Sequence, residues 1–360
     1  MESQPYQSAS FFSKEWGLSR KRIGDLCRNG RIPGAIRVGS IWAIPSDAVK
    51  PEDARSCEYL LDMSPKLKPF IKWAGGKGQI LDEIRSIYPE GLGDTIRRYA
   101  EPFIGGGAVL FDILGTYDLD EIYISDDNKE LLNVYRVIKE RPEDIISMLD
   151  KLQDTHLGMD MDDRKTYFYT NRDRFNELKV NNDGSVNVEL AALFIYLNKT
   201  CFNGLYRVNA KGLFNTPSGV YTNPMICDES NIRNVSKALK NVSINHGDFT
   251  KSYDFIDKDT FVYFDPPYRP LTVTASFTSY TEGSFNDDDQ RKLAEYARSL
   301  SDKGAKVALS NSDPKNSNPD DEFFDELYEG FNIRRIYANR AINSKGDSRG
   351  KITELLITNY

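Results

Sequence analysis

The segment VYFDPPY, at residues 262–268, carries the residue types best suited to chemistry in this chain. Its apolar start predicts a buried strand that delivers Asp265 to the carboxyl edge of a sheet, where ligands of α/β folds bind. Pro266 and Pro267 lack N–H donors and restrict φ. The Asp265 carboxylate and the Pro266 carbonyl are therefore expected to be fixed acceptors with few competing donors.

Two fixed acceptors can hold an aromatic amine. Their hydrogen bonds draw electron density onto the nitrogen and aim its lone pair, while Tyr268 offers a ring on which a base can stack. The pattern therefore predicts methylation of an aromatic NH2 group. A Pro-Pro pair also simply ends strands, but Asp before it and Tyr after it favour the catalytic interpretation.

A glycine-rich loop, EPFIGGGAVLFDIL at residues 101–114, is expected to follow one strand and open a helix. Its glycines let the backbone approach a ligand, and the helix start presents unpaired N–H groups. The loop would fit a dinucleotide phosphate as well as the charged methionine tail of S-adenosylmethionine. It departs from the GxGxxG spacing, however, and Glu101 would repel a diphosphate.

An acidic residue, Asp126, is expected at the end of the next strand, roughly 20 residues after the glycine loop. A carboxylate there can accept hydrogen bonds from ribose hydroxyls at the switch point of the sheet. Residues 126–128 could instead cap the helix that begins at 129. Taken with the glycine loop, the ligand interpretation is favoured.

These motifs need an α/β scaffold, and the pattern after residue 69 predicts one with a mainly parallel, Rossmann-like sheet. Residues 140–245 interrupt the alternation with helix-rich sequence and a Gly/Asn-rich stretch, which indicates an inserted helical domain. The expected strands are 98–102, 121–125, 261–264, 306–310, 333–338 and 354–359, and the expected helices are 128–139, 287–300 and 320–328.

The N-terminal segment, residues 8–50, has the pattern of a separate unit. A helix start at 10–15, a basic helix at 20–29 closed by Gly30, and a hairpin around Gly39 predict a winged helix-turn-helix. Docking on DNA or protein is the favoured role, and a purely structural cap is the alternative. The proline-containing, charged segment that follows predicts a linker.

The length and composition of the chain bear on the other classes of protein to which it could belong. The 360 residues suggest two or three domains, and no apolar run is long enough to span a bilayer. The first ten residues lack signal-peptide features, so we expect a cytoplasmic protein with reduced thiols. Two histidines and scattered cysteines make a metal site unexpected. The net charge of −7 argues mildly against nucleic acid, but local basic stretches decide that question.

The motifs together resemble the N6-adenine DNA methyltransferases, and residues 69–360 are similar to the Dam family. The similar segments appear in the family's order: FIKWAGGKGQIL, EPFIGGGAVLFD, SDDN, the hairpin LNKTCFNGLYRVNAKGLFNTPSG, and DPPY. Residues 15–45 resemble the excisionase/MerR-type DNA-binding module. The implied domains are a winged helix-turn-helix at 1–55, a linker at 56–68, a catalytic domain at 69–145 and 246–360, and a target-recognition domain at 146–245.

The resemblance implies S-adenosylmethionine as the cofactor. The glycine loop would surround its methionine moiety, Lys77 would offer a cation to its carboxylate, and Asp248 would face its adenine. Without the resemblance, the WAGGK segment could be either this cofactor motif or a phosphate-binding loop, although it lacks the GxxxxGK[ST] spacing of such loops. The implied cofactor site comprises Trp73, Lys77, Glu101, Phe103, Gly105, Gly107, Asp126, Asp248, Phe249 and Asp265.

The resemblance also implies double-stranded DNA as the partner and GATC as the site. Phe202 would wedge into the base stack, Asn203 would pair with groups orphaned by base flipping, and Arg207 would read a guanine. A plain phosphate contact is the alternative for Arg207. The implied DNA contacts are Lys72, Phe202, Asn203, Leu205, Arg207 and Pro217, with Arg20 and Arg22 in the N-terminal unit.

The implied activity is transfer of a methyl group from S-adenosylmethionine to the N6 of a flipped adenine, without a metal or a membrane, by a monomer or weak dimer. A catalytically silent, DNA-bound regulator is the alternative from a different class. Methylation of glutamine in protein goes typically with Asn at the position of Asp265. Methylation of cytosine N4 or of RNA adenine is a further alternative.

Overall fold

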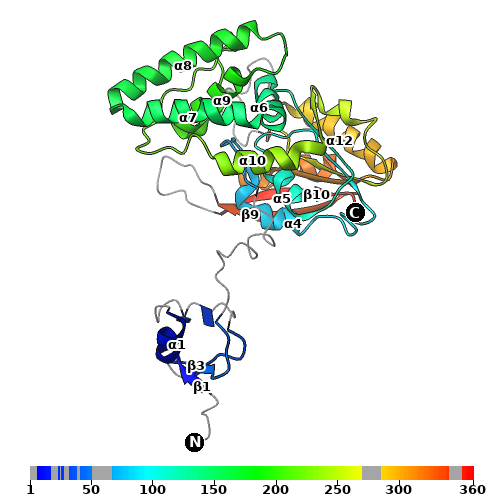
Figure 1. Cartoon of the computed structure of the whole chain (residues 1–360). Coiled ribbons are helices and arrows are strands. Elements are labelled where there is room, and N and C mark those ends of the chain that lie inside the picture. Colours follow the sequence, from blue (N-terminus) through cyan, green and yellow to red (C-terminus); the bar gives the residue numbers. More distant parts are fainter. Residues whose placement is uncertain are drawn as a thin grey trace, which may run out of the picture. The chain divides into compact units, whose positions relative to one another are not determined.

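The computed structural model describes residues 6–17, 23–24, 26–27, 32–38, 41–50, 67–269, 285–339 and 351–360 (Figure 1). The chain divides into two compact units, Met1–Lys66 and Leu67–Tyr360. The division falls within the expected linker at 56–68, most of which lies outside the described residues.

The N-terminal unit contains one described helix and a small antiparallel sheet. Helix α1 (Ala9–Trp16) begins at Ser8, whose Oγ accepts the N–H of Phe11 at 3.3 Å. The sheet has the order β1-β3-β2, with β1 (Tyr6–Ser8), β2 (Ile36–Val38) and β3 (Ile41–Pro45). The β2–β3 pair is the expected hairpin, whereas β1 was not predicted. Residues 23–24 and 26–27 are helical, and Arg20 and Arg22 lie outside the described residues.

The larger unit is built on a seven-stranded sheet with the order β6-β5-β4-β7-β8-β10-β9. The five strands from β6 to β8 run parallel, and β10 pairs antiparallel with both β8 and β9. The α/β class is therefore confirmed, with a mixed sheet. The strands are β4 (Arg98–Glu101), β5 (Glu121–Asp126), β6 (Val242–His246), β7 (Thr260–Phe264), β8 (Lys306–Ser312), β9 (Asn332–Asn339) and β10 (Lys351–Thr358).

Alternating residues of the strands point to opposite faces of the sheet, and they contribute to two separate hydrophobic cores. Tyr99 and Tyr263 face the core that includes α5 and α6, whereas Val262 and Phe264 face the core under α12 and α13. The helices of these layers are α4 (Leu81–Arg85), α5 (Ala108–Thr116), α6 (Lys129–Glu140), α12 (Asp287–Asp302) and α13 (Phe323–Leu327). Helix α13 is shorter than the expected 320–328 because Asp321 accepts the N–H of Phe323 and pairs with Arg269.

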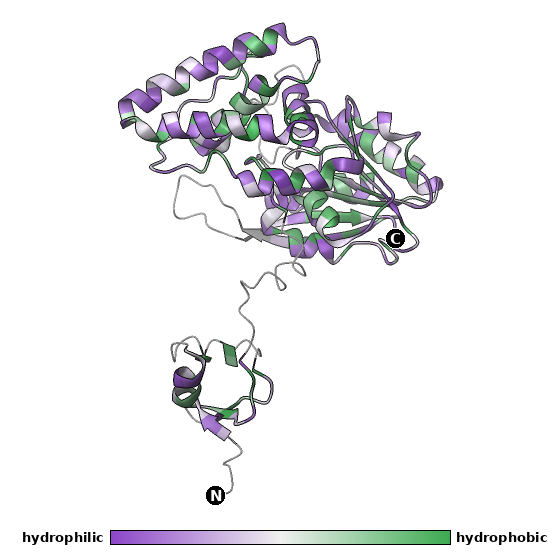
Figure 2. Ribbon diagram, viewed as in Figure 1, coloured by the Kyte–Doolittle hydropathy of each residue, from purple (hydrophilic) through white to green (hydrophobic). Residues whose placement is uncertain are grey.

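The insertion supplies α7 (Pro142–Gly158), α8 (Met161–Asn181), α9 (Val188–Thr200) and α10 (Glu229–Ala238). Helix α9 packs against α6, α7 and α8, and its apolar residues belong to the same core as Tyr99 and Ile124 of the sheet. Helix α8 is largely hydrophilic and buries only Phe168 and Phe175 (Figure 2). The expected division at residue 146 thus falls within α7, in a region that shares its core with the sheet. Among the described helices, none is both long and apolar enough to cross a membrane.

This shared core predicts that Ile195→Ala, in α9, destabilises the whole unit Leu67–Tyr360. Ile195 is 1% exposed, so its truncation should lower the free energy of unfolding by about 2–5 kcal/mol. Urea denaturation followed by circular dichroism and tryptophan fluorescence should shift as one transition. Val180→Ala, at a position 69% exposed, is the control and should change stability by no more than about 0.5 kcal/mol. Separate melting of the insertion would contradict the prediction.

Candidate active site

Four neighbouring parallel strands lead into acidic side chains at one edge of the sheet. Glu101 ends β4, Asp126 ends β5, Asp248 follows β6 by two residues, and Asp265 directly follows β7. Because β6, β5, β4 and β7 are adjacent and parallel, their carboxyl ends share the edge at which ligands of α/β sheets bind.

Asp265 is held through one of its two carboxylate oxygens. Lys77 Nζ lies 2.5 Å from Oδ1, and Ser310 Oγ donates to the same atom at 3.1 Å. Burial raises the pKa of Asp265, and the ion pair with Lys77 and the Ser310 hydrogen bond oppose that rise. Among the described residues no donor reaches Oδ2, so this oxygen is available to a ligand.

Lys77 joins the WAGGK and DPPY segments. Its side chain is 4% exposed, and its Nζ donates to the Gly75 carbonyl at 2.7 Å and lies 4.6 Å from the centre of the Tyr268 ring. The Tyr268 hydroxyl in turn donates to Glu354 at 2.8 Å. The expected cofactor lysine is thus found in direct contact with the expected catalytic residues.

The backbone after Asp265 also offers an acceptor. Pro266 is buried and Pro267 is exposed. No described residue donates a hydrogen bond to the Pro266 carbonyl oxygen. Asp265 Oδ2 and this carbonyl are therefore the two acceptors that the sequence pattern predicts.

The glycine loop requires glycine at two positions where φ is positive. Gly105 has φ +46°, and a Cβ there would lie 2.8 Å from Cδ1 of Trp73. Gly107 has φ +71°, and a Cβ there would lie 2.4 Å from the Tyr135 hydroxyl. The loop is tied to the next strand because the Gly105 N–H donates to Asp126 Oδ2 at 3.0 Å. A closely packed turn of this kind brings main-chain atoms near a ligand.

Asp126 is not the cap of the helix that follows it. Asn128 caps α6, because its Oδ1 accepts the N–H of Leu131 at 2.9 Å. Asp126 instead accepts the N–H groups of Gly105 and Asn128. Burial raises the pKa of Asp126, and these hydrogen bonds oppose the rise.

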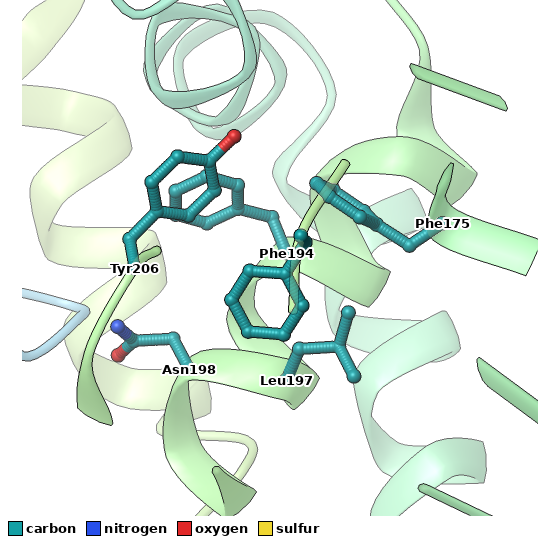
Figure 3. Close-up of a pocket in the computed structure, with 6 residues that line it drawn as sticks. Phe175, Phe194, Leu197, Asn198 and Tyr206 are labelled. Carbon is teal, nitrogen blue, oxygen red and sulfur yellow. The ribbon is translucent and has the colours of Figure 1, made fainter. Parts of the chain in front are cut away.

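Two aromatic groups flank this edge. Trp73 is stacked with Phe194 and Tyr206, at centroid distances of 6.3 and 5.9 Å, and these two rings also line an apolar pocket with Asn198 (Figure 3). In the second group, Phe103 lies 5.5 Å from Phe249. Trp73 and Phe249, both implied in the cofactor site, thus belong to two different aromatic groups.

Asp248 starts the short helix η4 (Phe249–Ser252). Its Oδ1 accepts the N–H of Thr250 at 2.9 Å, and its Oδ2 pairs with Lys292 at 3.0 Å. Lys292 Nζ also lies 5.2 Å from the centre of the Phe249 ring. The carboxylate is thus partly engaged by the protein itself.

Glu101 is 2% exposed and lies behind the glycine loop. The Tyr99 hydroxyl donates to its Oε2 at 2.7 Å. Burial holds the pKa of Glu101 well above its usual range, although the Tyr99 hydrogen bond and the nearby Lys77 act in the opposite direction. Glu101 is thus expected to keep its proton to a higher pH than an exposed glutamate does.

The hairpin after α9 begins with the turn η2 (Phe202–Gly204). Phe202 is 54% exposed, and Asn203 is the only described residue other than glycine with a positive φ, at +56°. Non-glycine residues in that conformation are strained and often functional. The Phe202 N–H donates to the Pro217 carbonyl at 2.9 Å, and Arg207 Nε donates to Asn215 Oδ1 at 2.8 Å.

Asn198 connects the hairpin to the WAGGK segment. Its Oδ1 accepts the N–H of Lys72 at 2.8 Å, and its Nδ2 donates to the carbonyls of Lys72 and Gly204. A Cβ at Gly204 would lie 2.7 Å from Cβ of Lys72, so only glycine fits there. The exposed Lys72 thus lies beside the hairpin that carries Phe202, Asn203, Leu205 and Arg207.

Comparison with known proteins shows the family of the chain. Residues 73–342 match the model of the D12 class N6 adenine-specific DNA methyltransferases. The chain is 52% identical to the type II methyltransferase M.MjaIII of Methanocaldococcus jannaschii, over 82% of this chain and 100% of that protein. It is 42% identical to the Lactococcus lactis type II methyltransferase M1.LlaDCHI, over 82% and 96% of the two chains. It is 31% identical to the DNA adenine methylase of Escherichia coli, over 81% and 95%.

The chain belongs to the D12 class. It is an adenine-specific DNA methyltransferase, as the resemblance of its motifs to the Dam family implied.

Several residues of this methyltransferase site were not singled out from the sequence. Ser310 contacts Asp265, Asn198 joins Lys72 to the hairpin, and Tyr206 stacks on Trp73. A signal existed for Ser310, because a polar run, Ser310 to Ser312, ends the apolar strand expected next to VYFDPPY. Asn198 and Tyr206 act through long-range contacts that leave no local pattern.

The raised pKa of Glu101 predicts a pH-dependent stability. Because its folded pKa is raised above the unfolded value of about 4.3, its contribution is present at low pH and is lost as pH rises towards the folded pKa. Glu101→Gln lacks this titration, so its stability relative to wild type should increase with pH, by up to about 1.4 kcal/mol per pH unit. Urea unfolding from about pH 5 to pH 8 measures the difference.

The exposed Glu295→Gln is the control for that series and should show no such trend. A difference between Glu101→Gln and wild type that stays constant with pH would mean that Glu101 is ionised in the folded protein.

Proposed function

We propose that this methyltransferase transfers a methyl group from S-adenosylmethionine to the N6 of a flipped adenine in double-stranded GATC sites. The observation that carries the proposal is the state of Asp265. Its Oδ1 is engaged by Lys77 and Ser310, whereas its Oδ2 and the neighbouring Pro266 carbonyl accept no hydrogen bond from the described residues. Two such acceptors match the two hydrogens of an exocyclic amine.

The residues at the sheet edge fit S-adenosylmethionine. The closely packed turn at Gly105 and Gly107 suits the methionine moiety, and the carboxylate of Asp126 has further lone pairs for ribose hydroxyls. Phe103, Phe249 and Asp248 would bound the adenine of the cofactor. When bound, this cofactor supplies an electrophilic methyl group on its sulfonium sulfur.

Phe202 and Tyr268 would bring the target adenine into place. Unstacking the base costs a few kcal/mol, which stacking on Tyr268 and insertion of the exposed Phe202 into the gap would offset. Asn203, held beside Phe202 in its strained conformation, would hydrogen-bond the groups left without partners. The turn leaves Asn203 exposed next to Phe202, where DNA could reach its amide.

Asp265 and Pro266 would then orient the amine. With the N6 hydrogens directed at Asp265 Oδ2 and the Pro266 carbonyl, the nitrogen lone pair points out of the ring plane towards the methyl donor. The methylated nitrogen becomes acidic and loses its proton late, so no base of high pKa is required. Asp265 Oδ2 is the nearest acceptor for that proton. Positioning and electrostatics supply most of the catalysis.

The GATC assignment is supported by the residues around the hairpin. Arg207 can read guanine O6 and N7, and Lys72 is fixed beside the hairpin by Asn198. Leu205 and Pro217 lie on the two segments of the hairpin and would touch base edges. Digestion of DNA from expressing cells with enzymes that distinguish methylated from unmethylated GATC tests the assignment. If the DNA is still cut completely by an enzyme that methylation of GATC blocks, the assignment is rejected.

The first prediction from this proposal concerns Asp265. Asp265→Asn retains one acceptor oxygen but not the charge, and Asp265→Ala removes both oxygens. Turnover should fall by about 100- to 1,000-fold or more, the scale of losing one preorganised group. Asp265→Ala also leaves the buried Lys77 unpaired, which should cost about 3–5 kcal/mol of stability. Single-turnover methylation of a GATC duplex measures the rate.

Circular dichroism should show that the Asp265→Asn variant is folded, so that its lost activity reflects chemistry. Retention of more than a few per cent of wild-type turnover by either variant would remove Asp265 from the mechanism.

The second prediction separates the two regions expected to bind DNA. We propose that the N-terminal unit is a winged helix-turn-helix that adds phosphate contacts. Leu67–Tyr360 is a unit by itself, and one relative is matched over its whole length by 82% of this chain. Deletion of residues 1–64 should therefore leave GATC methylation measurable, but lower DNA affinity and flatten its salt dependence. Arg207→Ala should instead cost about 1–3 kcal/mol of discrimination at one guanine.

Fluorescence anisotropy with GATC and scrambled duplexes at several salt concentrations measures both effects. If the truncation destroys GATC selectivity, the hairpin is not the reader. If it leaves affinity and salt dependence unchanged, the N-terminal unit does not contribute to binding at this site.

A further inference from the structure

Two buried amide side chains hold the backbone that follows Asp265. Gln290 lies in the first turn of α12 and Asn311 lies in β8, and both are 0% exposed. Gln290 Nε2 donates to the Pro267 carbonyl at 3.1 Å, and Asn311 Nδ2 donates to Gln290 Oε1 at 3.1 Å. Asn311 Oδ1 accepts the N–H of Arg269 at 3.3 Å. The two amides thus form a continuous chain from β8 to the DPPY segment.

Arg269 fixes the other end of this segment. Its carbonyl accepts from Ser312 Oγ at 2.9 Å, and its guanidinium pairs with Asp287 and Asp321, each at 2.8 Å. The main chain is therefore held at Pro267 and on both sides of Arg269. Between Asp265 and these anchors, the Pro266 carbonyl receives no hydrogen bond from the described residues.

This anchoring restricts the orientation of the Pro266 carbonyl, because the proline that follows it limits rotation of the backbone. The ring of Pro267 fixes its φ, and the hydrogen bond from Gln290 to the Pro267 carbonyl restrains its ψ. The peptide plane that carries the Pro266 carbonyl then cannot rotate independently. Burying two amides is costly unless their polar atoms are paired, and apolar residues would fill the same space without that requirement. Amides are thus useful here for orientation.

We propose that Gln290 and Asn311 are positioning residues for methyl transfer, which act by aiming the Pro266 carbonyl at the target amine. The inference rests on the proposed function, because it needs N6 to be bound by that carbonyl. Neither side chain touches the substrate or the cofactor in this scheme. Their loss should lower kcat while leaving the binding of S-adenosylmethionine and GATC DNA unchanged.

Two variants of Gln290 test the proposal. In Gln290→Glu the carboxyl can accept from Asn311 and, when protonated, donate its O–H to the Pro267 carbonyl. Once ionised it has no donor and repels that oxygen. The kcat of Gln290→Glu relative to wild type should therefore be near one at low pH and fall on the order of 10- to 100-fold as pH rises. Gln290→Met cannot donate at any pH, so its relative kcat should be low and independent of pH.

The measurements are burst-phase methylation of a GATC duplex from about pH 5.5 to pH 8.5, normalised to active sites by cofactor binding, with circular dichroism at each pH. A purely structural role would lower the amount of folded enzyme but not the kcat per active site. Wild-type kcat in Gln290→Met would overturn the proposal, because this variant cannot donate to the Pro267 carbonyl at any pH. Should Gln290→Glu unfold at high pH, the uncharged Gln290→Met still decides.

Failure of the proposed function gives a different result. Wild-type enzyme would then leave the GATC duplex unmethylated at every pH, and the inference would fall with it. An active wild type together with an unimpaired Gln290→Met rejects only the role of Gln290 and Asn311.

Discussion

The ion pair between Lys77 and Asp265 is the constraint on which the site depends. A nearly buried ammonium without a partner would cost several kcal/mol, so Lys77 binds the start of the methyltransferase unit to the end of β7. The ion pair also gives the two carboxylate oxygens of Asp265 different roles. Oδ1 satisfies Lys77 and Ser310, which opposes the rise in the pKa of Asp265 that burial causes, and Oδ2 remains for a substrate.

A second connection runs from the WAGGK segment to the hairpin that follows α9. Trp73 stacks on Tyr206, whose hydroxyl accepts from Lys179 at 2.9 Å and donates to Glu130 in the first turn of α6. The hairpin is thus fixed to the helix that follows Asp126 as well as to WAGGK. Since α9 belongs to the same hydrophobic core as the sheet, the hairpin begins at the end of a well-packed helix. This geometry explains how a short, irregular segment can hold its side chains in defined positions.

The sequence predicted the parts of this structure that local rules determine. Apolar strands, a glycine turn and acidic strand ends are encoded within short windows, and β4, β5, β7 and β8 were found where expected. The short helix η4 that Asp248 caps and the boundary of the insertion were not foreseen. Both depend on contacts between segments far apart in the chain, as does the pairing of Asn198 with Lys72. Residues such as Gln290 gave no signal because a buried glutamine in an acidic helix start looks like any surface position.

The order of strands explains why distant motifs can share one reaction. A chain that enters the sheet at β4, moves outward through β5 and β6, and returns to β7 places the glycine loop and DPPY on adjacent strands. The insertion between α6 and β6 interrupts that path after the glycine loop and Asp126 and before DPPY. Because β5 and β6 are paired in parallel, the connection between them must return from the carboxyl edge of the sheet to the amino edge, and the insertion lies within this connection. The position of the hairpin is instead set by side-chain contacts: Asn198 and Tyr206 fix it to the WAGGK segment, and Lys77 of that segment pairs with Asp265.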